Sequence, residues 1–471
     1  MTIDSLAELK SLVKQSPFLG QLLKPMCALL SQTARLSGAF QSSADQSLGH
    51  LEENLKRPLG VFLAEMLQRA AQEKAGQTPP KCPVCERKLT RRRKVERTVR
   101  TSYGEIKVTR LHGWCAQCKQ WFCPGDEALG VESGYSPGVQ EAAALLASKM
   151  PLSEASAVME RLTGLKLPET TLDRVAKQAA QKAREKRRQR DAQACLGGAT
   201  LAAQAVAKTP ATLVIMMDAW NIRERDDFGQ SAALRKKGLE PSRWHWVWTG
   251  TVFGLDARAE KNGRSMLLER GYVATRAGME SFTTQLHAEA LRHGLGRAER
   301  VLVMGDGGAW IWTIAEGRFG EASQRIDLYH IKQHLWVLAK ELHQDPKTQA
   351  LWVRRMKNQL KRGRTGQAIS QWEQAVKGLA QPQKEAAQKE INYFKEHQSR
   401  MSYAEADRRH EPCGTGAIES TCRQYQCRFK RPGQFWSQEG DEGLLCLDNF
   451  WRNNRWHLLF PHSKSFDPSK N

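Results

Sequence analysis

The sequence contains no run of about 20 consecutive apolar residues, the length that a helix needs to cross a bilayer. Its first residues, MTIDSLAELKSLV, lack the basic start and apolar stretch of a secretory signal peptide. No internal repeat is visible along the chain, so nothing points to a repeat architecture. We therefore expect a cytoplasmic protein with no membrane partner.

Acidic residues are also in short supply. The chain has 50 Asp and Glu residues against 72 Lys and Arg residues, which gives a formal net charge of +22. Because each phosphate neutralised by Lys or Arg releases condensed counterions, this surplus favours a polyanionic partner. A solvated basic surface is the alternative. The 40% hydrophobic content over 471 residues indicates a globular chain of roughly two to four domains.

The 11 cysteines should be mostly reduced in the cytosol, so closely spaced pairs indicate metal ligands rather than disulfides. Cys82-Pro-Val-Cys85 and Cys115-Ala-Gln-Cys118 are two such pairs, separated by a segment that favours a β-hairpin. A hairpin would bring the four thiolates to the corners of a tetrahedron, which structural Zn²⁺ prefers. Zinc would then fold a ribbon too small to sustain its own core. His112 and Cys123 lie close enough to replace one ligand, so the exact set stays open.

Changes in pattern along the chain predict five regions. They are a helical segment (1–78), a zinc ribbon (79–130), a helix-turn-helix-like region (131–192), a linker (193–210) and an α/β domain (211–460). The ribbon carries the basic arm Arg91, Arg92, Arg93 and Lys94, which could contact DNA phosphates. Leucines at helical spacing near the N-terminus predict a packed helical cap, with self-association as the alternative.

The region around Gly164 is typical of a helix-turn-helix. Helices are expected over Glu141–Lys149 and Ser153–Leu162, with Ser153 as N-cap, and Thr170 or Thr171 should open a third helix. Short helices around a glycine-containing turn can place residues such as Thr170 and Thr171 in the major groove. An ordinary helical hairpin is the alternative. The basic run 182–190 beside it favours DNA.

Beyond residue 210 the sequence becomes α/β in character. Apolar segments predict strands over Leu213–Met217, Trp244–Phe253, Val301–Met304 and Ile326–Tyr329, with a weaker strand over Met266–Leu268 and Tyr272–Ala274. The stretch from about 331 to 403 is helical and too long for one helix. We place a helical insertion at about 335–405. The fold class is thus a multi-domain α+β or α/β protein.

Acids at the ends of predicted strands are the main chemical feature. Asp218 follows the strand Leu213–Met217, and Asp306 follows Val301–Met304. Two aspartates at the ends of adjacent strands can share divalent cations, as phosphodiester chemistry requires. Hard oxygen ligands suit Mg²⁺ or Mn²⁺. The alternative is that both residues form turns, where aspartate is common.

A third acid, Glu419, lies in Gly414-Thr-Gly-Ala-Ile-Glu419, at the start of a probable helix. Arg423 is one turn further on and should share its face. Arg428 and Lys430 follow as further candidates for contacting nucleic acid. An interaction with the helix dipole is the simpler explanation for a glutamate at this position.

At these residues the sequence resembles the bacterial insertion-sequence transposases of the Kra type, within the Mutator-like DDE group. The resemblance covers about 80–455. Its markers are the two cysteine pairs, Asp218 after the first strand, Gly305-Asp306-Gly307, Asp327-Leu-Tyr-His330, Gly414-Thr-Gly-Ala-Ile-Glu419-Ser, and Arg428-Phe-Lys430-x-x-Gly433-x-x-Trp436. The first 75 residues are not covered by it.

The resemblance implies an RNase H-like catalytic core with a helical insertion between the second and third acids. It also implies a metal-binding triad of Asp218, Asp306 and Glu419. Asp327 and His330 match a motif in which the histidine contacts the scissile strand or steadies the site. The alternative for that pair is the start of a helix with Asp327 near its cap. Glu224, Asp226 and Asp227 are nearby acids that could be confused with Asp218.

The sequence therefore predicts a DNA transposase that performs metal-dependent strand cleavage and strand transfer, with Mg²⁺ (or Mn²⁺) and Zn²⁺ as cofactors. Its partner would be double-stranded DNA, both the ends of the element and the target, and its location nucleoid-associated. A substrate with two ends favours a homodimer or a larger assembly. Two alternatives remain: a non-catalytic DNA-binding regulator derived from a transposase, and an RNase H-like nuclease that does not integrate.

Overall fold

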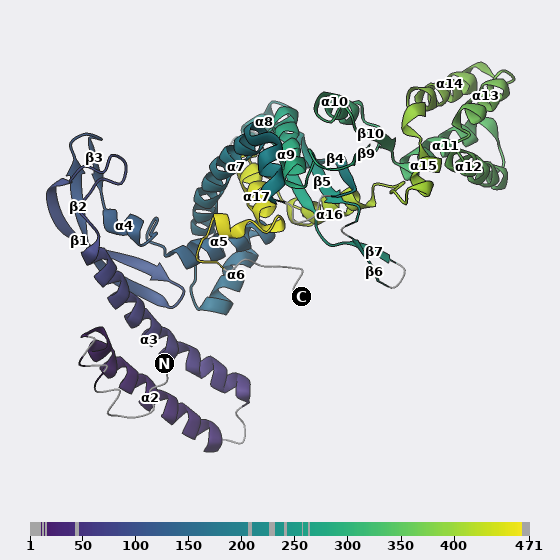
Figure 1. Ribbon diagram of the computed structural model, residues 1–471. Coiled ribbons are helices and arrows are strands. Elements are labelled where there is room, and N and C mark those ends of the chain that lie inside the picture. The colour runs from purple at the N-terminus through teal and green to yellow at the C-terminus, as the bar shows by residue number, and fades with distance from the viewer. Residues whose placement is uncertain are drawn as a thin grey trace. The chain divides into compact units, whose positions relative to one another are not determined.

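A computed structural model describes residues 11, 14, 17–42, 47–205, 210–225, 231–239, 243–256, 258–261 and 264–463. The chain divides into two compact units, Met1–Ala179 and Ala180–Asn471, whose elements are labelled in Figure 1. Each unit is treated by itself below. The protein belongs to the α+β class. No helix in the described ranges is long and apolar enough to cross a membrane.

The first unit contains mostly helices and one small sheet. Its elements are α2 (Pro17–Ser42), α3 (Leu48–Gln77), β1 (Thr90–Thr101), β2 (Gly104–Cys115), β3 (Gln120–Phe122), α4 (Pro124–Ala128), α5 (Pro137–Lys149), α6 (Leu152–Thr163) and the first part of α7 (Glu169–Ala205). The three strands form one sheet in the order β1-β2-β3.

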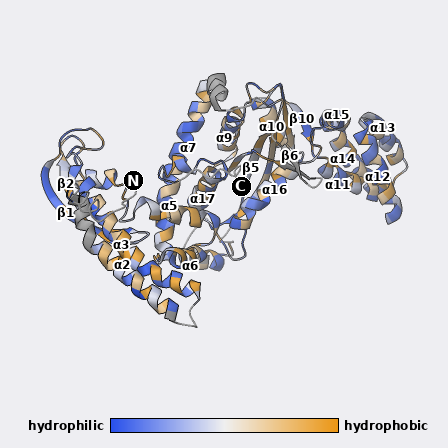
Figure 2. Ribbon diagram, turned by 60° about the horizontal axis from the view of Figure 1, so that its bottom comes forward, coloured by the Kyte–Doolittle hydropathy of each residue, from blue (hydrophilic) through white to orange (hydrophobic). Residues whose placement is uncertain are grey.

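The predicted hairpin is confirmed. β1 and β2 pair antiparallel, and the turn between them depends on Gly104, whose φ of +132° suits glycine. Helix α3 packs along β2, where the Gln72 side-chain amide exchanges hydrogen bonds of 2.8 and 2.9 Å with the backbone of Thr109. The helical segment and the ribbon therefore pack together. Figure 2 shows hydrophilic residues in β1.

The predicted helix-turn-helix is also helical in the structure, with different boundaries. Helices α5, α6 and α7 enclose a small core that includes Val139, Met159 and Leu172. Gly164 ends α6 with a φ of +71°. The prediction that Ser153 is the N-cap is wrong, because α6 begins at Leu152 and its N-cap is Pro151, two residues before Ser153. Proline suits this position because the first turn lacks backbone partners anyway.

The predicted linker over 193–210 is wrong in its first part, because α7 continues to Ala205; residues 206–209 lie outside the described ranges. Alanine favours helix strongly enough to offset the two glycines at 197–198. Tertiary contacts add to this. Arg187 pairs with Glu442 at 3.0 Å, and Asp191 pairs with Arg292 at 2.7 Å, both largely buried. The basic run 182–190 is thus partly committed to the second unit's own packing.

The second unit is built on a mixed five-stranded sheet. Its strands are β4 (Thr212–Glu224), β5 (Arg243–Gly254), β8 (Gly271–Thr275), β9 (Arg300–Gly305) and β10 (Ser323–Ile326), in the order β10-β9-β4-β5-β8. β9 runs parallel to β4 and β10, whereas β5 runs antiparallel to β4 and β8. The weaker predicted strand is split: Tyr272–Ala274 lies in β8. Residues 266–267 belong instead to a separate ribbon of β6 (Arg258–Lys261) and β7 (Arg264–Leu267). α8 (Ser231–Lys236) lies between β4 and β5 in the chain.

Alternation along the strands assigns the two faces of this sheet. Ile215, Met217 and Val303 belong to the core cluster that also holds residues of α9 (Met279–Arg292) and α10 (Ala309–Arg318). Met216 and Met304 belong to a second cluster, with residues of α16 (Gly416–Phe429) and α17 (Gln438–Arg452). Because side chains alternate with period two, Asp218 in β4 lies on the α16 face. A short 3₁₀ turn (Trp456–Leu458) follows α17.

The helical insertion is present between β10 and α16. It comprises α11 (Leu328–Leu342), α12 (Pro346–Lys361), α13 (Thr365–Val376), α14 (Gln381–Glu396), a 3₁₀ turn (Gln398–Arg400) and α15 (Tyr403–Arg408). The strand predicted over Ile326–Tyr329 is wrong beyond its first residue. β10 ends at Ile326 and Asp327 caps α11, because its side chain accepts a hydrogen bond from the Tyr329 amide.

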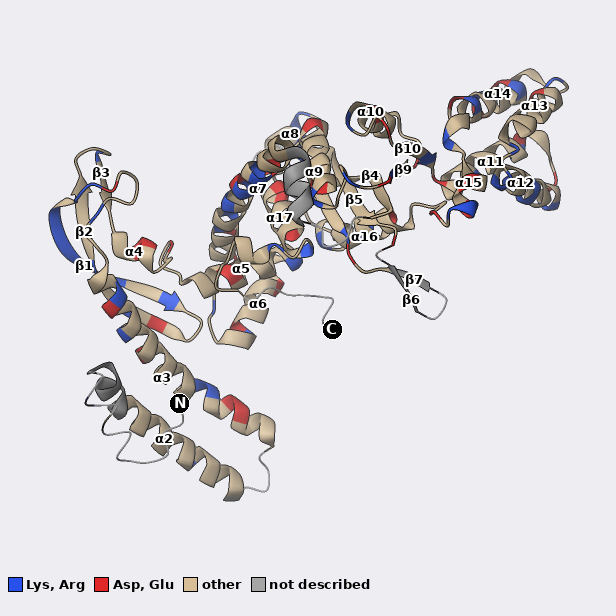
Figure 3. Ribbon diagram, in the orientation of Figure 1, with Lys and Arg blue, Asp and Glu red and all other residues tan. Residues whose placement is uncertain are grey.

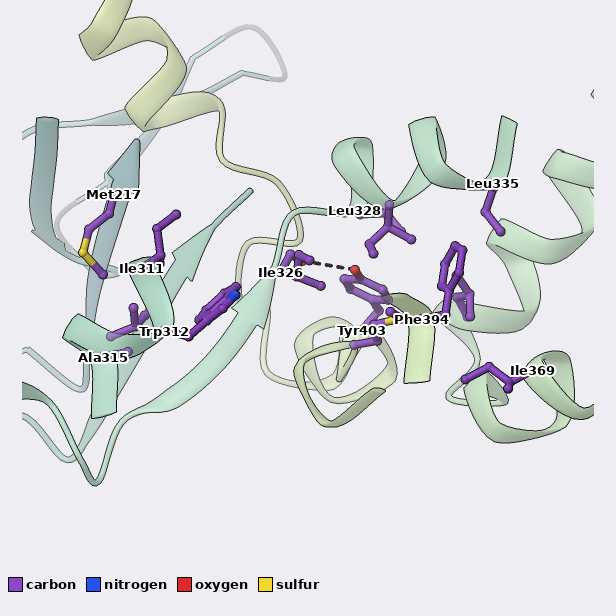
Figure 4. Close-up of a cluster of buried hydrophobic side chains, with 14 of the residues drawn as sticks. Met217, Ile311, Trp312, Ala315, Ile326, Leu328, Leu335, Ile369, Phe394 and Tyr403 are labelled. Carbon is purple, nitrogen blue, oxygen red and sulfur yellow. Dashed lines mark hydrogen bonds between the residues drawn. The ribbon is translucent and has the colours of Figure 1, made fainter. Parts of the chain in front are cut away.

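The insertion shares one hydrophobic core with the sheet. Figure 4 shows Leu335, Ile369 and Phe394 from the insertion in the same cluster as Met217 and Ile311. At the junction, the buried Tyr403 hydroxyl donates a 3.1 Å hydrogen bond to the Ile326 carbonyl. The insertion is therefore packed against the strand end that precedes Asp327.

Candidate metal sites and the carboxylate pocket

The four cysteines of the ribbon meet at one point. Their sulfur atoms all lie within 4.8 Å of one another, with Cys82 Sγ 3.8 Å from Cys118 Sγ and Cys85 Sγ 3.5 Å from Cys115 Sγ. A disulfide would require about 2.0 Å. A tetrahedron of thiolates at about 2.3 Å from Zn²⁺ has edges of about 3.8 Å. The spacing fits a zinc ion, and these four residues would hold it.

The alternative ligands lie outside this cluster. His112 stacks on Trp121, with ring centroids 4.8 Å apart, and its Nδ1 accepts a 3.4 Å hydrogen bond from Arg93. Cys123 is the residue before α4. Within the described ranges, the four cysteines are the only group of three or more potential ligands that meets this distance criterion. The backbone N–H of Cys118 lowers the pKa of the Cys115 thiol to about 7, which favours a thiolate there.

The basic arm lies beside this site. Arg91, Arg92, Arg93 and Lys94 are all exposed and line an open groove of about 620 Å³. A bulge interrupts the β1–β2 register between Thr90 and Arg93, and Arg91 has a φ of +44°. The Arg93 guanidinium lies 5.6 Å from the Trp121 ring centre. The arm thus presents cations together with an exposed aromatic ring.

In the second unit, one open pocket of about 500 Å³ contains all five acids and histidines predicted for catalysis. Its lining includes Asp218, Asp306, Asp327, His330 and Glu419. These residues come from β4, from the loop after β9, from the start of α11 and from the first turn of α16. Segments up to about two hundred residues apart in sequence therefore converge on one site.

Asp218 lies inside its strand, not at its end. β4 continues to Glu224 and pairs with β5 along its whole length, so the predicted strand end was wrong. The parallel pairing with β9, however, stops at Met216. Asp218 therefore lies just where the parallel neighbour leaves the sheet. Its Oδ1 accepts a 2.7 Å hydrogen bond from the Ala219 amide.

Asp306 follows β9 directly, as predicted, and two glycines shape its loop. A Cβ on Gly305 would come within 2.5 Å of the Ile311 side chain. Gly307 has a φ of +106°, and a Cβ there would come within 2.2 Å of the Tyr393 hydroxyl oxygen. Asp306 Oδ1 accepts a 3.1 Å hydrogen bond from the Gly308 amide. Only glycine allows so close an approach of helices to the loop.

Glu419 reaches the pocket because the segment before α16 lies along β10 and α11. The buried pair Arg325–Glu411 has a distance of 2.8 Å, and the Leu328 amide donates to the Cys413 carbonyl at 2.9 Å. The buried Thr415 hydroxyl then lies 2.9 Å from Asp327 Oδ2 and 3.3 Å from Glu419 Oε1. Thr415 bridges two of the acids. Sequence reasoning missed it, although its place between Gly414 and Gly416 was a signal.

The pocket concentrates negative charge. Burial raises the pKa of Asp218, and the nearby carboxylates of Asp306 and Glu419 raise it further. Burial also raises the pKa of Asp327, with Glu419 adding to it, against hydrogen bonds from Tyr329 and Thr415. The two aspartates are thus held partly desolvated beside other acids. A cation would relieve this repulsion.

His330 lies on the first turn of α11 and is half-buried. Burial lowers the pKa of His330, and the neighbouring His334 lowers it further, which favours the neutral ring. Tyr329 and Gln333, which the sequence did not single out, also line the pocket. The cap role of Asp327, left open by the sequence, is confirmed, and it coexists with a place in the pocket.

The other nearby acids are excluded or lie outside the described ranges. Glu224 is buried and pairs with the Arg276 guanidinium away from the pocket lining. Asp226 and Asp227 lie in the segment 226–230, which is outside the described residues.

The residues predicted to contact nucleic acid differ in their exposure to solvent. Thr170, Arg423 and Lys430 are exposed and Thr171 is half-buried. Arg428 was predicted to contact nucleic acid, and the structure contradicts this. It is 5% exposed, with its guanidinium 4.8 Å from the Trp436 ring centre. Trp436 in turn donates through Nε1 to the Phe429 carbonyl at 2.9 Å. The Arg428 to Trp436 marker therefore has a packing role.

Comparison with known proteins gives a distant relationship. The chain is 23% identical over 377 residues to a protein from Streptococcus gallolyticus described as "UPF0236 protein in vanSb 3'region". The similarity covers 79% of this chain and 76% of that protein. That description names no activity. No protein-family model matches the chain.

Proposed function

We propose that this protein is a DNA transposase of the DDE type, which cleaves and joins DNA strands at the ends of an insertion sequence. The observation that carries the proposal is the convergence of Asp218, Asp306 and Glu419 in one open pocket. The mixed sheet, with the first acid on the strand beside the parallel neighbour, is compatible with the RNase H-like core that the sequence resemblance implies.

The donor set fits Mg²⁺ or Mn²⁺. All three proposed ligands are carboxylates, and hard oxygen ligands are what these cations prefer. Burial raises the pKa of Asp218, and its acidic neighbours raise it as well. A bound cation would offset both effects, because its positive charge would stabilise the ionised carboxylates. Bound divalent ions would lower the charge on the scissile phosphate and activate the attacking oxygen.

The side chains of the pocket would hold the metal ions and orient the reacting groups. The backbone amides of Ala219 and Gly308 each donate a hydrogen bond to one oxygen, of Asp218 and of Asp306 respectively, and hold these carboxylates in place. Thr415 fixes Glu419 relative to Asp327. We propose that His330 contacts the scissile strand or the group that attacks it. The carboxylates position ions and do not attack the DNA, so we expect no covalent protein–DNA link.

Basic surfaces support DNA as the substrate. Figure 3 shows Lys and Arg along β1 and along α12. In the insertion, five exposed cations lie within one stretch: Arg354, Arg355, Lys361, Arg362 and Arg364. Such stretches would hold the DNA backbone, while the ribbon and the helices around Gly164 would read the element ends. A substrate with two ends favours a dimer or a larger assembly.

The test is cleavage and strand transfer on a labelled DNA fragment that carries the element's own ends, in Mg²⁺. We would compare the wild type with Asp306→Asn, and with Asp407→Asn as a matched control, since Asp407 is an exposed acid outside the pocket. We expect cleavage by the wild type and the control. Asp306→Asn should bind DNA but lose about 1000-fold or more in cleavage rate, as when a preorganised charge-stabilising group is removed.

Other outcomes separate the alternatives. Binding without cleavage by any variant, in both Mg²⁺ and Mn²⁺, would favour a DNA-binding regulator. Cleavage without strand joining would favour a nuclease of the same fold. Unchanged cleavage by Asp306→Asn would remove the pocket from the mechanism.

A further inference from the structure

His330 is linked to a second histidine, one helical turn further along α11. The Nε2 atoms of His330 and His334 lie 3.2 Å apart, and the two rings meet edge to face. At this distance one proton lies between the two nitrogens, donated by one ring and accepted by the other. The state of His334 therefore decides which nitrogen of His330 carries a proton.

Glu390 determines the state of His334. This residue lies on α14, and its Oε2 is 2.7 Å from Nδ1 of His334; the side chains are 12% and 23% exposed. A carboxylate can only accept, so Nδ1 of His334 carries a proton. In neutral His334, Nε2 is then an acceptor. His330 must donate from its own Nε2, and its Nδ1 is left with a lone pair.

The insertion also holds these rings mechanically. Tyr393, three residues after Glu390, stacks on His334 with ring centroids 3.9 Å apart and an angle of 17°. Its hydroxyl lies 3.5 Å from the Asp306 carbonyl oxygen. Gly307 makes this contact possible, since a Cβ there would collide with the hydroxyl. The face of α14 that fixes His334 thus also contacts the loop of the second acid.

We propose that Glu390 and His334 are positioning residues, which fix the tautomer and orientation of His330 in the pocket through the chain Glu390–His334–His330. Within the described part of the protein, Nδ1 of His330 has no hydrogen-bond partner. It is therefore the nitrogen available to a group entering the pocket. It can accept a hydrogen bond from a water molecule or a hydroxyl, such as the attacking group of a phosphoryl transfer. The helical insertion would then be part of the active site rather than an appendage.

A neutral His330 fixed in this way accepts through Nδ1 and cannot donate to a phosphate oxygen, whereas a protonated His334 would donate to His330 Nε2 and make Nδ1 the donor. In either case, Glu390, His334 and His330 together determine whether Nδ1 of His330 accepts or donates a hydrogen bond. The inference rests on the proposed function for its consequence, but its tautomer statement stands on geometry alone.

The kinetic test uses the full-length protein and the labelled end-bearing DNA in single-turnover cleavage. His334→Phe keeps a ring stacked on Tyr393 but removes both nitrogens, and Glu390→Ala removes the acceptor. We expect each to lower the cleavage rate of the saturated complex by about 10- to 100-fold, as for partners that orient a functional group. DNA affinity and thermal midpoint should stay close to the wild type. His334→Gln, which keeps an acceptor for His330, should recover part of the loss.

The matched control is Glu385→Gln, an exposed glutamate on the same helix whose partner is Gln381. It should cleave at the wild-type rate. Wild-type rates in both His334→Phe and Glu390→Ala would overturn the proposal. A loss that follows only a lowered thermal midpoint would do so as well, because packing would then explain it.

A second measurement does not depend on catalysis. Long-range ¹H–¹⁵N spectra of full-length protein labelled on its 12 histidines report tautomers directly, with His330→Gln and His334→Phe providing assignments. At mildly alkaline pH we expect a proton on Nδ1 of His334 and on Nε2 of His330. In Glu390→Ala both rings should become tautomer mixtures. If the wild type never cleaves DNA but shows these tautomers, the proposed function fails and the positioning chain survives; mixed tautomers in the wild type would overturn the chain itself.

Discussion

The four-cysteine site and the carboxylate pocket are built by opposite means. The cysteines lie on two tight turns joined by one hairpin, so a single local register brings them together. The pocket draws its acids from β4, from the loop after β9 and from α16, and these meet only after the sheet, the insertion and α16 have packed. A metal can organise the first site from a short segment. The acids of the second site are brought together only by the packed fold.

Removal of zinc should destabilise the protein more than any other change proposed below. The destabilisation should be confined to the ribbon and should not reach the carboxylate pocket. Structural zinc contributes an apparent binding free energy of about 10–16 kcal/mol in small zinc domains. We expect equimolar zinc by elemental analysis in the wild type and its loss in Cys82→Ser. Proteolysis should then cleave within 79–130 while 211–460 stays protected.

Cys427→Ser is the control, because Cys427 is exposed and outside the cluster. It should retain zinc. Full zinc content in Cys82→Ser, or loss of protection across the second unit as well, would break the contrast between the two sites.

The dependence of the pocket on distant packing can be tested at Gly307. Gly307→Ala forces an L residue to a φ of +106° and places a Cβ within 2.2 Å of the Tyr393 hydroxyl oxygen. We expect the free energy of unfolding to fall by about 1–3 kcal/mol. Chemical denaturation followed by tryptophan fluorescence would measure it.

Gly317→Ala provides the comparison, because nothing lies within 4 Å of its added Cβ and the residue is inside α10. That variant should gain about 0.5–1 kcal/mol. Equal and small effects in both would mean that α14 does not press on the Asp306 loop.

The second unit should also show a pH dependence of stability that arises from one buried acid. Burial, together with the neighbouring Glu224, raises the pKa of Asp441 to about 9. An unfolded aspartate titrates near 4. The folded state therefore binds the extra proton between these values, so stability falls as pH rises from about 4 to about 9.

Asp441→Asn removes this titration. We expect the thermal midpoint of the variant to vary less with pH across that window and to exceed the wild-type midpoint at its alkaline end. Parallel pH profiles of the two proteins would show that Asp441 ionises normally in the folded state.

The smallest expected effects concern DNA affinity. If both units contact the backbone, Arg92→Ala on the ribbon and Arg355→Ala on α12 should each lower the salt slope of binding by about 0.9, the value for one phosphate contact. The double variant should lose the contributions of both contacts to the salt slope. Lys384→Ala, an exposed cation on α14, is the control. An unchanged slope in either variant would restrict the DNA surface to the other unit.

Several features followed from sequence because their physics is local. The cysteine spacing predicts the metal cluster, glycine at 104 predicts the hairpin turn, and apolar runs predict the central strands. Boundaries were less certain. The strand before Asp218 proved longer than its apolar run, because β5 supplies hydrogen bonds beyond it. The linker over 193–205 proved helical, because alanine favours helix and buried ion pairs anchor α7.

Roles that depend on contacts between distant residues were beyond the sequence. Arg428 is of a residue type that often contacts DNA, but its side chain is buried against the Trp436 ring. The packing of α16 decides this burial, so the sequence could not predict it. Thr415, His334 and Glu390 gained their positions only when α11, α14 and the segment before α16 came together.

By itself, then, the sequence determined the charge, the spacing of the cysteine pairs and the apolar runs of the central strands, because each depends on composition or on neighbours along the chain. Only the tertiary structure decided that Asp218, Asp306 and Glu419 line one pocket and that the insertion reaches into it. The physical reason is that contacts across hundreds of residues depend on how whole elements pack, and a local pattern carries no record of that packing.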